Sequence, residues 1–323
     1  MVDLSKVTKA TEWPEQRREI ESTVREWLGP LPGTRVEPQI KVMDEQSGPG
    51  YVRRRINYFL DEWQRISAWL FVPEVRDEER PGILCCHRAV KQGKDEPAGI
   101  DAHPPLAFAQ HYAEQGYFTI APDCITAGER VTPGLKPYDT AGFYRDQPAV
   151  SALGRMLFDH TRALDVLAEI KQVDNARLGV IGHGFGGVNA LLAAAFDDRT
   201  QACVASSAFV RFADDPDPVG RWASEDNFVY LPKVREAAET GEFAFDWEHI
   251  LALAAPSAVL LNTPLNDPAL PKPASCRKAV TQAKKIYKLL GAPDAVKNHT
   301  HRGGPTFTRD SLHVADEWME RWL

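Results

Sequence analysis

Short, uniformly apolar runs alternate with amphipathic segments along most of this chain. The apolar runs lie at 82–86, 117–121 and 178–181, and segments 105–115 and 151–171 between them carry apolar residues at helical spacing. Apolar strands separated by helices are typical of a parallel sheet with helices on both faces. The pattern therefore predicts an α/β fold.

The same alternation continues to the C-terminus. Strands are predicted at 202–205, 257–261 and 295–298, a helix at 275–290, and a last helix that ends in Trp322-Leu323. Together with the earlier strands, these segments predict a mostly parallel central sheet of about eight strands.

The N-terminal part has a different pattern. Apolar residues at helical spacing predict a helix at 12–28, which Gly29-Pro30 ends. Two strands are predicted at 51–58 and 67–72, with Asp61-Glu62 as the hairpin turn between them. We expect residues 1–50 to form a helical extension and residues 51–323 to form the α/β domain.

Two further features belong to this expected domain. Charged residues Arg53, Arg54 and Arg55 favour an edge position for the first strand of the pair. An irregular segment at about 209–245 is expected to be an insertion over the sheet.

Composition limits the partners of the chain. Its 323 residues carry a net charge of -7, which favours a small-molecule partner over nucleic acid or an anionic membrane, and a homodimer is compatible with it. No apolar run approaches the roughly 18 residues of a membrane span, and the N-terminus lacks a signal-peptide pattern, so a cytoplasmic location is expected. The five cysteines are irregularly spaced, which predicts reduced buried thiols, no metal and no cofactor.

The candidate chemistry is concentrated where the apolar run 178–181 meets Gly182-His183-Gly184-Phe185-Gly186-Gly187. A strand that turns sharply through small residues into a helix is typical of a nucleophile elbow, G-x-S-x-G, which exposes a serine hydroxyl above a sheet. Gly184 occupies the position of that serine.

The same residues fit the dinucleotide-binding pattern G-x-G-x-x-G. That pattern requires an acidic residue about 20 positions later, at the end of the next strand, and it normally lies in the first βαβ unit. Here the next strand is followed by Ser206-Ser207, and several strands precede the turn. The nucleotide interpretation is therefore disfavoured.

A serine hydrolase also needs an acid and then a histidine after later strands, in that chain order. Asp267 follows the strand at 257–261, and His299 and His301 follow the strand at 295–298. His301 is favoured as the base because His299 lies at the strand end, and Asp267 is the expected orienting acid. The oxyanion donors are expected to be the backbone N–H groups of Phe185 and Arg88.

Other residues are candidates for substrate contact. His87 lies beside the predicted oxyanion loop and His183 beside Gly184, although packing or loop orientation is the simpler role for His87. Aromatic residues of the insertion, Trp222, Phe228 and Tyr230, are candidates for an apolar wall, although core packing is the favoured role for any one of them.

With these elements in place, the chain resembles the α/β-hydrolase superfamily, and within it the dienelactone-hydrolase-like and acetyl-xylan-esterase-like bacterial ester hydrolases. The resemblance rests on segments 27–32, 68–73, 93–99, 116–123, 173–187 and 196–199. It implies a carboxylic-ester hydrolase with a Ser, Asp and His triad. The spacing of the loop from His301 to Phe307 and the residue Gly184 depart from the family pattern.

Gly184 has no side chain, so an acyl-enzyme cannot form there. Three accounts remain: a Ser→Gly inactivated or substrate-trapping variant; a natural binding module or a His301/Asp267 acid-base enzyme such as a lyase, isomerase or cyclase; or a nucleophile elsewhere. The candidates for that other nucleophile are Cys85, Cys86, Cys124 and Ser206. The first account is favoured, because the other expected parts of the triad are present.

Overall fold

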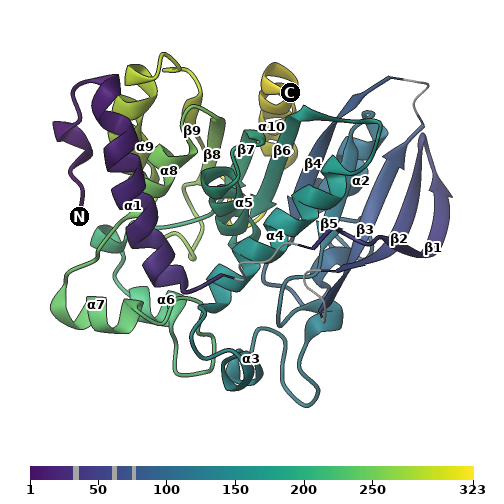
Figure 1. Ribbon diagram of the computed structural model, residues 1–323, viewed down its shortest axis with the longest axis horizontal. Helices are drawn as coiled ribbons and strands as arrows, with labels where there is room; N and C mark the ends of the chain where they lie inside the picture. Colours follow the sequence, from purple (N-terminus) through teal and green to yellow (C-terminus); the bar gives the residue numbers. More distant parts are fainter. Residues whose placement is uncertain (32–35, 60–63, 75–77) are drawn as a thin grey trace.

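The computed structural model describes residues 1–31, 36–59, 64–74 and 78–323, and within them nine strands form one sheet (Figure 1). The strands are β1 (Lys41–Gly48), β2 (Tyr51–Phe59), β3 (Arg65–Pro73), β4 (Arg80–Cys86), β5 (Phe118–Pro122), β6 (Val173–His183), β7 (Thr200–Ser206), β8 (Ala258–Pro264) and β9 (Val296–His301). Their order across the sheet is β1-β2-β3-β5-β4-β6-β7-β8-β9. Strands β1, β2, β3 and β5 pair antiparallel, and the remaining pairs, from β5–β4 to β8–β9, are parallel.

Helices cover both faces of the sheet, as the sequence predicts. The helices are α1 (Trp13–Leu28), α2 (Phe108–Glu114), α3 (Ala141–Asp146), α4 (Ala152–Ala168), α5 (Phe185–Phe196), α6 (Pro218–Trp222), α7 (Val234–Thr240), α8 (Trp247–Ala254), α9 (Ala274–Leu289) and α10 (Arg309–Trp322). Helices α1, α4, α5, α8 and α9 pack side by side in one layer, and α2 and α10 pack against strands from the other face (Figure 1). The mostly parallel α/β architecture is therefore confirmed, with nine strands in place of about eight.

The first strand lies in the segment that was expected to be helical. Helix α1 forms as predicted, but Lys41–Gly48 is strand β1, and its residues are almost all exposed. A strand with solvent on both faces needs no alternation of apolar and polar residues, so its sequence gives no strand signal. Because β1 is the edge strand, β2 with Arg53, Arg54 and Arg55 lies one position inside, and the edge prediction for these arginines is wrong. The predicted turn at Asp61-Glu62 lies outside the described residues.

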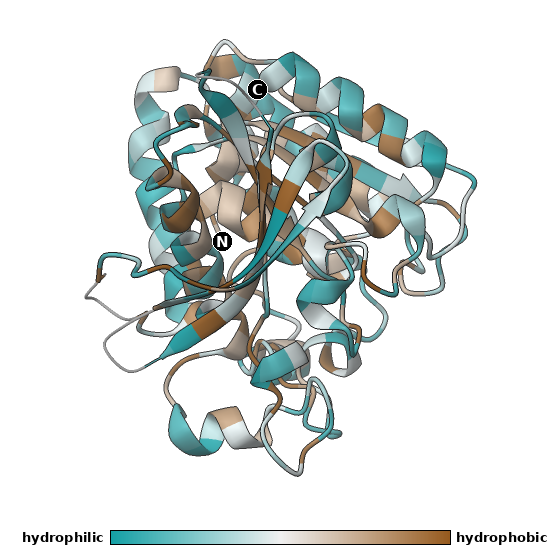
Figure 2. Cartoon of the chain, turned by 90° about the vertical axis from the view of Figure 1, so that its right-hand side faces the viewer, coloured by the Kyte–Doolittle hydropathy of each residue, from teal (hydrophilic) through white to brown (hydrophobic). Residues whose placement is uncertain are grey.

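The hydrophobic core follows the central strands. Strands β4, β5 and β8 are buried along almost their whole length, and helix α4 is buried at nearly every position. Figure 2 shows hydrophobic residues gathered on strands and helices in the interior, and hydrophilic residues along the outer surfaces of the helices. The buried strands fix the carboxyl edge of the sheet, where the loops that carry the candidate site residues begin.

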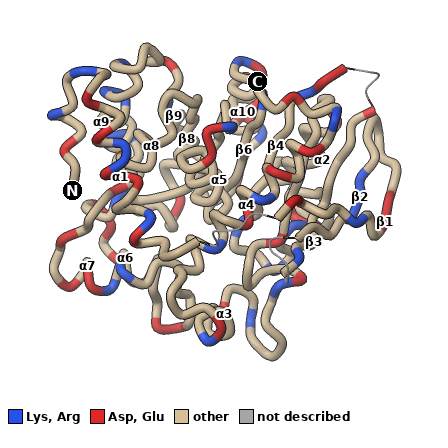
Figure 3. Tube along the Cα trace, in the orientation of Figure 1, with Lys and Arg blue, Asp and Glu red and all other residues tan. Residues whose placement is uncertain are grey.

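The segment at 209–245 is an insertion with short helices, α6 and α7, so it is less irregular than its sequence suggests. Acidic and basic residues are interspersed along the whole trace (Figure 3), in keeping with the modest net charge of -7. Within the described ranges, no helix has the length and apolar character that a membrane crossing requires.

Candidate active site

The turn between β6 and α5 has the geometry of a nucleophile elbow. Gly184 stands between the last residue of β6, His183, and the first residue of α5, Phe185, with φ 57° and ψ -123°. Its N–H donates to the Ser206 carbonyl on the neighbouring strand at 2.8 Å. A positive φ at this position exposes the residue at the carboxyl edge of the sheet, as the elbow motif requires.

Small residues on either side make the turn possible. A Cβ atom on Gly182 would lie 2.1 Å from the Gly186 carbonyl oxygen, and a Cβ atom on Gly186 would lie 2.3 Å from the Cys86 carbonyl oxygen. A Cβ atom on Gly184 would meet no heavy atom within 4 Å. The elbow therefore excludes a side chain at both flanking glycines and leaves open space for one at Gly184.

One of the two predicted oxyanion donors is available and the other is engaged. Phe185 is the first residue of α5, where a backbone N–H has no acceptor inside the helix. The Arg88 N–H instead donates to a Glu96 carboxylate oxygen at 3.2 Å, and the Arg88 side chain binds the other Glu96 oxygen through Nε at 2.9 Å and Nη2 at 2.5 Å. Glu96 accepts hydrogen bonds from both the backbone N–H and the guanidinium group of Arg88. The Arg88 N–H is therefore not free to act as the predicted oxyanion donor in this structure.

Asp267 lies near the carboxyl edge of the sheet, buried, in the loop after β8. The Ser207 hydroxyl donates to its Oδ2 atom, and the Ala269 N–H donates to its Oδ1 atom at 2.8 Å. Ser207 follows β7 directly and has φ 50°, an unusual value for a residue with a side chain. The acid is thus held from the β7 side of the site.

The two candidate histidines lie on strand β9 and not in a loop, because the strand continues to His301. Their side chains share one face of the strand, with ring centroids 6.2 Å apart. His301 Nδ1 accepts a hydrogen bond from the Gly303 N–H at 3.1 Å, so the neutral ring carries its proton on Nε2. A triad base needs the opposite tautomer, with Nδ1–H directed at the acid.

The electrostatic surroundings of His301 agree with this placement. Burial and the neighbouring His299 lower the pKa of His301, and the carboxylate that raises it is Asp310, at the start of α10. Asp267 and His301 are each hydrogen-bonded to other groups. The structure therefore brings both residues to the same edge of the sheet without joining them as an acid-base pair.

The loops that carry these two residues are nevertheless tied together. The Leu265 N–H donates to the His301 carbonyl at 2.9 Å, and the Asn266 N–H donates to the Gly303 carbonyl at 3.2 Å. The Asn266 side chain also donates to the Arg302 carbonyl at 2.7 Å. These bonds fix the acid loop and the histidine loop as neighbours, which a triad requires.

His183 connects the histidine loop to the sheet. Its Nε2 lies 3.0 Å from the Pro305 carbonyl, its Nδ1 lies 2.9 Å from the Ser206 hydroxyl, and Asn262 Nδ2 donates to the same hydroxyl at 3.1 Å. One arrangement satisfies all three contacts: Asn262 donates to Ser206, Ser206 to His183, and His183 to Pro305. Burial lowers the pKa of His183, which keeps the ring neutral. His183 is thus buried and fully bonded, which indicates a positioning role and not substrate contact.

His87 has a similar structural role. Its Nε2 accepts from the Cys124 N–H at 3.1 Å, and its Nδ1 lies 2.7 Å from the Arg88 carbonyl. Burial lowers its pKa as well. Both ring nitrogens are used to join the loops after β4 and β5, so substrate binding by His87 is not supported.

Two of the three predicted aromatic residues lie beside the elbow. The rings of Phe185 and Tyr230 are 4.7 Å apart between centroids, and Phe228 lies 4.5 Å from Tyr230 and 6.0 Å from Phe185. Phe185 and Phe228 are half-buried, so this cluster can form an apolar wall next to Gly184. Trp222 instead packs against Trp247 at 5.5 Å in the hydrophobic core, and its predicted place in the wall is wrong.

The loops over the elbow are anchored by a buried ion cluster. Lys94 is 3% exposed, and its Nζ binds Asp123 at 2.9 Å and Glu129 at 2.8 Å. Asp123 also accepts from the backbone N–H groups of Lys94 and Glu129, at 2.9 and 3.0 Å. The cluster joins the loop after β4 to the loop after β5, and so fixes the segment that contains Arg88 and Glu96.

The other nucleophile candidates do not fit. All five cysteines are buried and free, as predicted, and burial raises the pKa of Cys85, Cys86 and Cys124, which disfavours the reactive thiolate. Ser206 is buried in the hydrogen-bonded row with His183. Among the described residues, no group of three or more His, Cys, Asp or Glu side chains could hold a metal ion.

Comparison with known proteins identifies the family. The model of the acetyl xylan esterase (AXE1) family matches residues 39–213, more than half of the chain. The chain belongs to the acetyl xylan esterase family. The matched range contains the elbow, Arg88 and Glu96, and it ends before Asp267 and His301.

Several known proteins are similar to this acetyl xylan esterase family member over most of their length. YtaP of Bacillus subtilis (strain 168), which bears a provisional hydrolase name, is 23% identical over 273 residues, covering 82% of this chain and 86% of its own. A glucuronoyl esterase from Solibacter usitatus is 18% identical, with a TM-score of 0.76 over 97% of this chain and 94% of its own. An acetyl xylan esterase from Paenibacillus sp. R4 is 18% identical, with a TM-score of 0.64 over 98% and 96%. At these identities the solved structures support the fold alone.

Two residues near the site of this acetyl xylan esterase family member were not predicted. Ser207 had a usable signal, because a polar residue directly after a buried parallel strand lies at the edge where α/β folds bind ligands. Glu96 had none, because its partner Arg88 is in the same loop and no sequence pattern shows that the loop folds back on itself.

Proposed function

We propose that this chain is an ester-binding member of the acetyl xylan esterase family in which Gly184 occupies the place of the nucleophilic serine. The observation that carries the proposal is the elbow itself: a positive φ at Gly184 combined with open space where a side chain would begin. With glycine at this position, the site would bind a carboxylic ester without forming an acyl-enzyme. Such a protein is an inactivated or substrate-trapping form of an ester hydrolase.

The ester carbonyl would lie above Gly184, with the Phe185 N–H as one oxyanion donor. The wall of Phe185, Phe228 and Tyr230 would face the apolar part of the ester. His301 would act as base only after its Nδ1 leaves the Gly303 N–H and turns toward Asp267. The bonds between the two loops support this proposal, because they already hold the two residues on adjacent strand ends.

The alternative of a natural His301/Asp267 acid-base enzyme has less support. Such an enzyme needs the pair to be joined, and here Asp267 is bound to Ser207 and His301 to Gly303. A binding module without turnover agrees with all of the geometry described for the chain with Gly184.

The decisive experiment is the Gly184→Ser variant, assayed with a small aryl ester and labelled with a fluorophosphonate. We expect esterase activity and covalent labelling in this variant and neither in the protein with Gly184. Gly184→Ala is the matched control, since it adds a Cβ atom without a hydroxyl. If the serine variant folds but shows neither activity nor labelling, the ester-hydrolase assignment of the site is wrong.

A further inference from the structure

The elbow supplies one free backbone donor to an ester carbonyl, and an oxyanion hole takes two donors. The Phe185 N–H is free at the start of α5, whereas the Arg88 N–H donates to Glu96 at 3.2 Å. The second donor therefore has to come from another group beside Gly184.

The backbone that precedes Arg88 is in contact with the elbow. Strand β4 ends at Cys86 and is a parallel neighbour of β6. A Cβ atom on Gly186, in the first turn of α5, would lie 2.3 Å from the Cys86 carbonyl oxygen and 2.7 Å from the His87 carbonyl oxygen. Arg88 is the next residue, so its side chain begins beside the proposed ester site.

Glu96 holds the guanidinium group of Arg88 by one edge. Arg88 Nε and Nη2 both donate to Glu96 Oε1, at 2.9 and 2.5 Å. The Glu96 side chain is 6% exposed, and the Arg88 side chain is 31% exposed. A buried carboxylate therefore fixes a guanidinium group that solvent still reaches.

The backbone of Arg88 is fixed as well. The Tyr138 hydroxyl donates to the Arg88 carbonyl at 2.8 Å, and His87 Nδ1 lies 2.7 Å from the same oxygen. A donor that is held at both its backbone and its side chain needs little reorganisation when a ligand binds, which is the condition for strong stabilisation of an oxyanion.

One nitrogen of this guanidinium group is still available. Within the described ranges, Arg88 Nη1 has no hydrogen-bond acceptor, and it carries two N–H groups. Hydrogen bonds from a charged donor are stronger than those from a neutral amide. Arg88 Nη1 is therefore suited to an oxygen that becomes negative during a reaction.

The charges around Arg88 favour a neutral carbonyl over a carboxylate as its acceptor. Burial lowers the pKa of His183, and the positive charge of Arg88 lowers it further. The carboxylates of Asp267 and Glu96 raise the same pKa, so all three charged groups lie near the residue that precedes Gly184. Two carboxylates and one guanidinium group leave a net negative charge, which opposes a ligand that is already an anion.

We infer, resting on the proposed function, that the Arg88 guanidinium group and not the Arg88 backbone N–H is the second donor to the carbonyl oxygen of a bound ester. Arg88 Nη1 approaches that oxygen from the β4 side, and the Phe185 N–H approaches it from the α5 side. Glu96 is the positioning residue, because it fixes the guanidinium group without touching the ester. In the Gly184→Ser variant, the serine oxygen adds to the carbonyl carbon, its proton passes to His301, and the carbonyl electron pair becomes the oxyanion that both donors hold.

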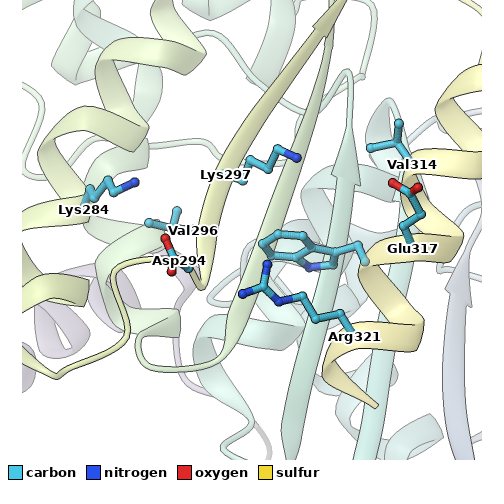
Figure 4. Close-up of a pocket in the computed structure, with 8 residues that line it drawn as sticks. Lys284, Asp294, Val296, Lys297, Val314, Glu317 and Arg321 are labelled. Carbon is cyan, nitrogen blue, oxygen red and sulfur yellow. The ribbon is translucent and has the colours of Figure 1, made fainter.

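The first test measures hydrolysis of phenyl acetate in the Gly184→Ser background. Arg88→Ala should lower kcat about 100-fold and raise KM only about threefold, because the lost donor acts mainly on the oxyanion. Added methylguanidinium should restore part of the kcat of Arg88→Ala and leave the parent unchanged. Arg321→Ala is the matched control and should have no effect, since Arg321 lies on α10 beside the start of β9, at the opposite edge of the sheet (Figure 4).

The Glu96→Gln variant distinguishes the side chain of Arg88 from its backbone N–H. We expect kcat to fall about tenfold in the same background, because the guanidinium group loses its fixed position. Combined with Arg88→Ala, the change should cost nothing further, since the two residues act as one unit. A higher kcat in Glu96→Gln would mean that the released backbone N–H is the donor, and the inference would be wrong.

Three other kinetic results would overturn the inference, once circular dichroism has verified that the variants fold. These are an unchanged kcat in Arg88→Ala, an equal loss in Arg321→Ala, and a loss in Arg88→Ala that methylguanidinium does not restore. The last result would mean that Arg88 acts through the structure of its loop.

Calorimetric titration of the chain with Gly184, which lacks the nucleophile, separates the role of Arg88 from the proposed function. Arg88→Ala should raise the Kd for phenyl acetate about threefold, and Arg321→Ala should leave it unchanged. If Gly184→Ser is inactive and these Kd values are found, the hydrolase assignment is wrong and the donor role of Arg88 stands. If Gly184→Ser is active and Arg88→Ala matches its parent, only the donor role is wrong. Absence of both binding and activity would overturn both.

Discussion

The Ser207 hydroxyl donates a hydrogen bond to the Asp267 carboxylate, across the ends of β7 and β8. Asp267, the acid expected to orient His301, is therefore already bound by a residue at the end of β7. A carboxylate has two oxygens and can accept several hydrogen bonds, so the bond to Ser207 can persist while Asp267 also accepts from an imidazole. In that arrangement Ser207 would position the acid for the base.

In the Gly184→Ser background, we expect Asp267→Asn to lower kcat/KM by about 100-fold or more, because the amide cannot stabilise the imidazolium form of His301. Ser207→Ala should cost less than about tenfold, since it removes one neutral donor and leaves the charge of Asp267 in place. Ester hydrolysis kinetics measure both effects. Equal losses in the two variants would contradict the assignment of Asp267 as the acid.

Gly184 should make the elbow more stable than a residue with a side chain does. Its φ of 57° costs glycine little, whereas Ser or Ala at this position is strained although the space is open. We expect Gly184→Ser and Gly184→Ala each to lower the free energy of unfolding by about 1 kcal/mol. Urea unfolding checks this, and a gain in stability in either variant would show that the turn does not keep its positive φ.

The elbow could be predicted from sequence because its small residues allow few other structures. Gly182 and Gly186 approach other backbone atoms too closely for side chains, so the motif directly reflects the geometry. The buried parallel strands were also predictable, because a strand that is covered on both faces is apolar along its whole length. Strand β1 was missed because solvent on both faces leaves no pattern.

For Asp267 and His301 the sequence predicts the correct edge of the sheet but the wrong hydrogen-bond partners. Asp267 and His301 do lie after neighbouring strands, yet β9 extends to His301 and directs its ring toward the α10 side, near Asp310. The choice of hydrogen-bond partner depends on loop conformations over a few residues, such as the turn that places the Gly303 N–H against His301. The spacing of residues along the chain does not predict which hydrogen-bond partner a side chain will choose.

Lys94 should be essential for stability. Replacing it with Met leaves the carboxylate of Asp123, which is 0% exposed, without its cation, so we expect a loss of about 3–5 kcal/mol in the free energy of unfolding. The matched control is Lys233→Met, which removes an exposed ion pair with Glu26 and should cost less than about 1 kcal/mol. Urea unfolding of both variants measures the difference. Similar losses in the two variants would show that the buried cluster adds little stability.

His160 should make the fold sensitive to acid. Burial lowers its pKa from 6.5 to about 4, with smaller contributions from His87 and Arg130, while Asp159 opposes the shift. The unfolded chain then binds more protons than the folded one between these values, so stability present at pH 7 is lost as the pH falls from about 6.5 to about 4, by about 3 kcal/mol. Urea unfolding across this range should show a weaker pH dependence in His160→Gln. An unchanged slope would mean that other groups control the acid response.

Lys297 should influence the histidines on its strand. Burial lowers the pKa of His299, and the positive charge of Lys297 lowers it further. Lys297→Met should therefore raise the pKa of His299, and NMR titration of the ring proton measures the change. Lys288→Met is the control and should leave the titration of His299 unaltered, since Lys288 makes no contribution to that pKa.

The row from Asn262 to the Pro305 carbonyl has a single direction: Asn262 donates to Ser206, Ser206 donates to His183, and His183 donates to Pro305. A proton added to His183 at Nδ1 would point at the Ser206 O–H, so the hydroxyl would have to turn its own proton away before the ring could take up charge. Burial also lowers the pKa of His183, so this row of side chains beside Gly184 stays uncharged over the pH range in which exposed histidines titrate. Negative charge that develops in a bound ester would therefore be met by fixed donors such as the Phe185 N–H, and by no ionised group in this buried row.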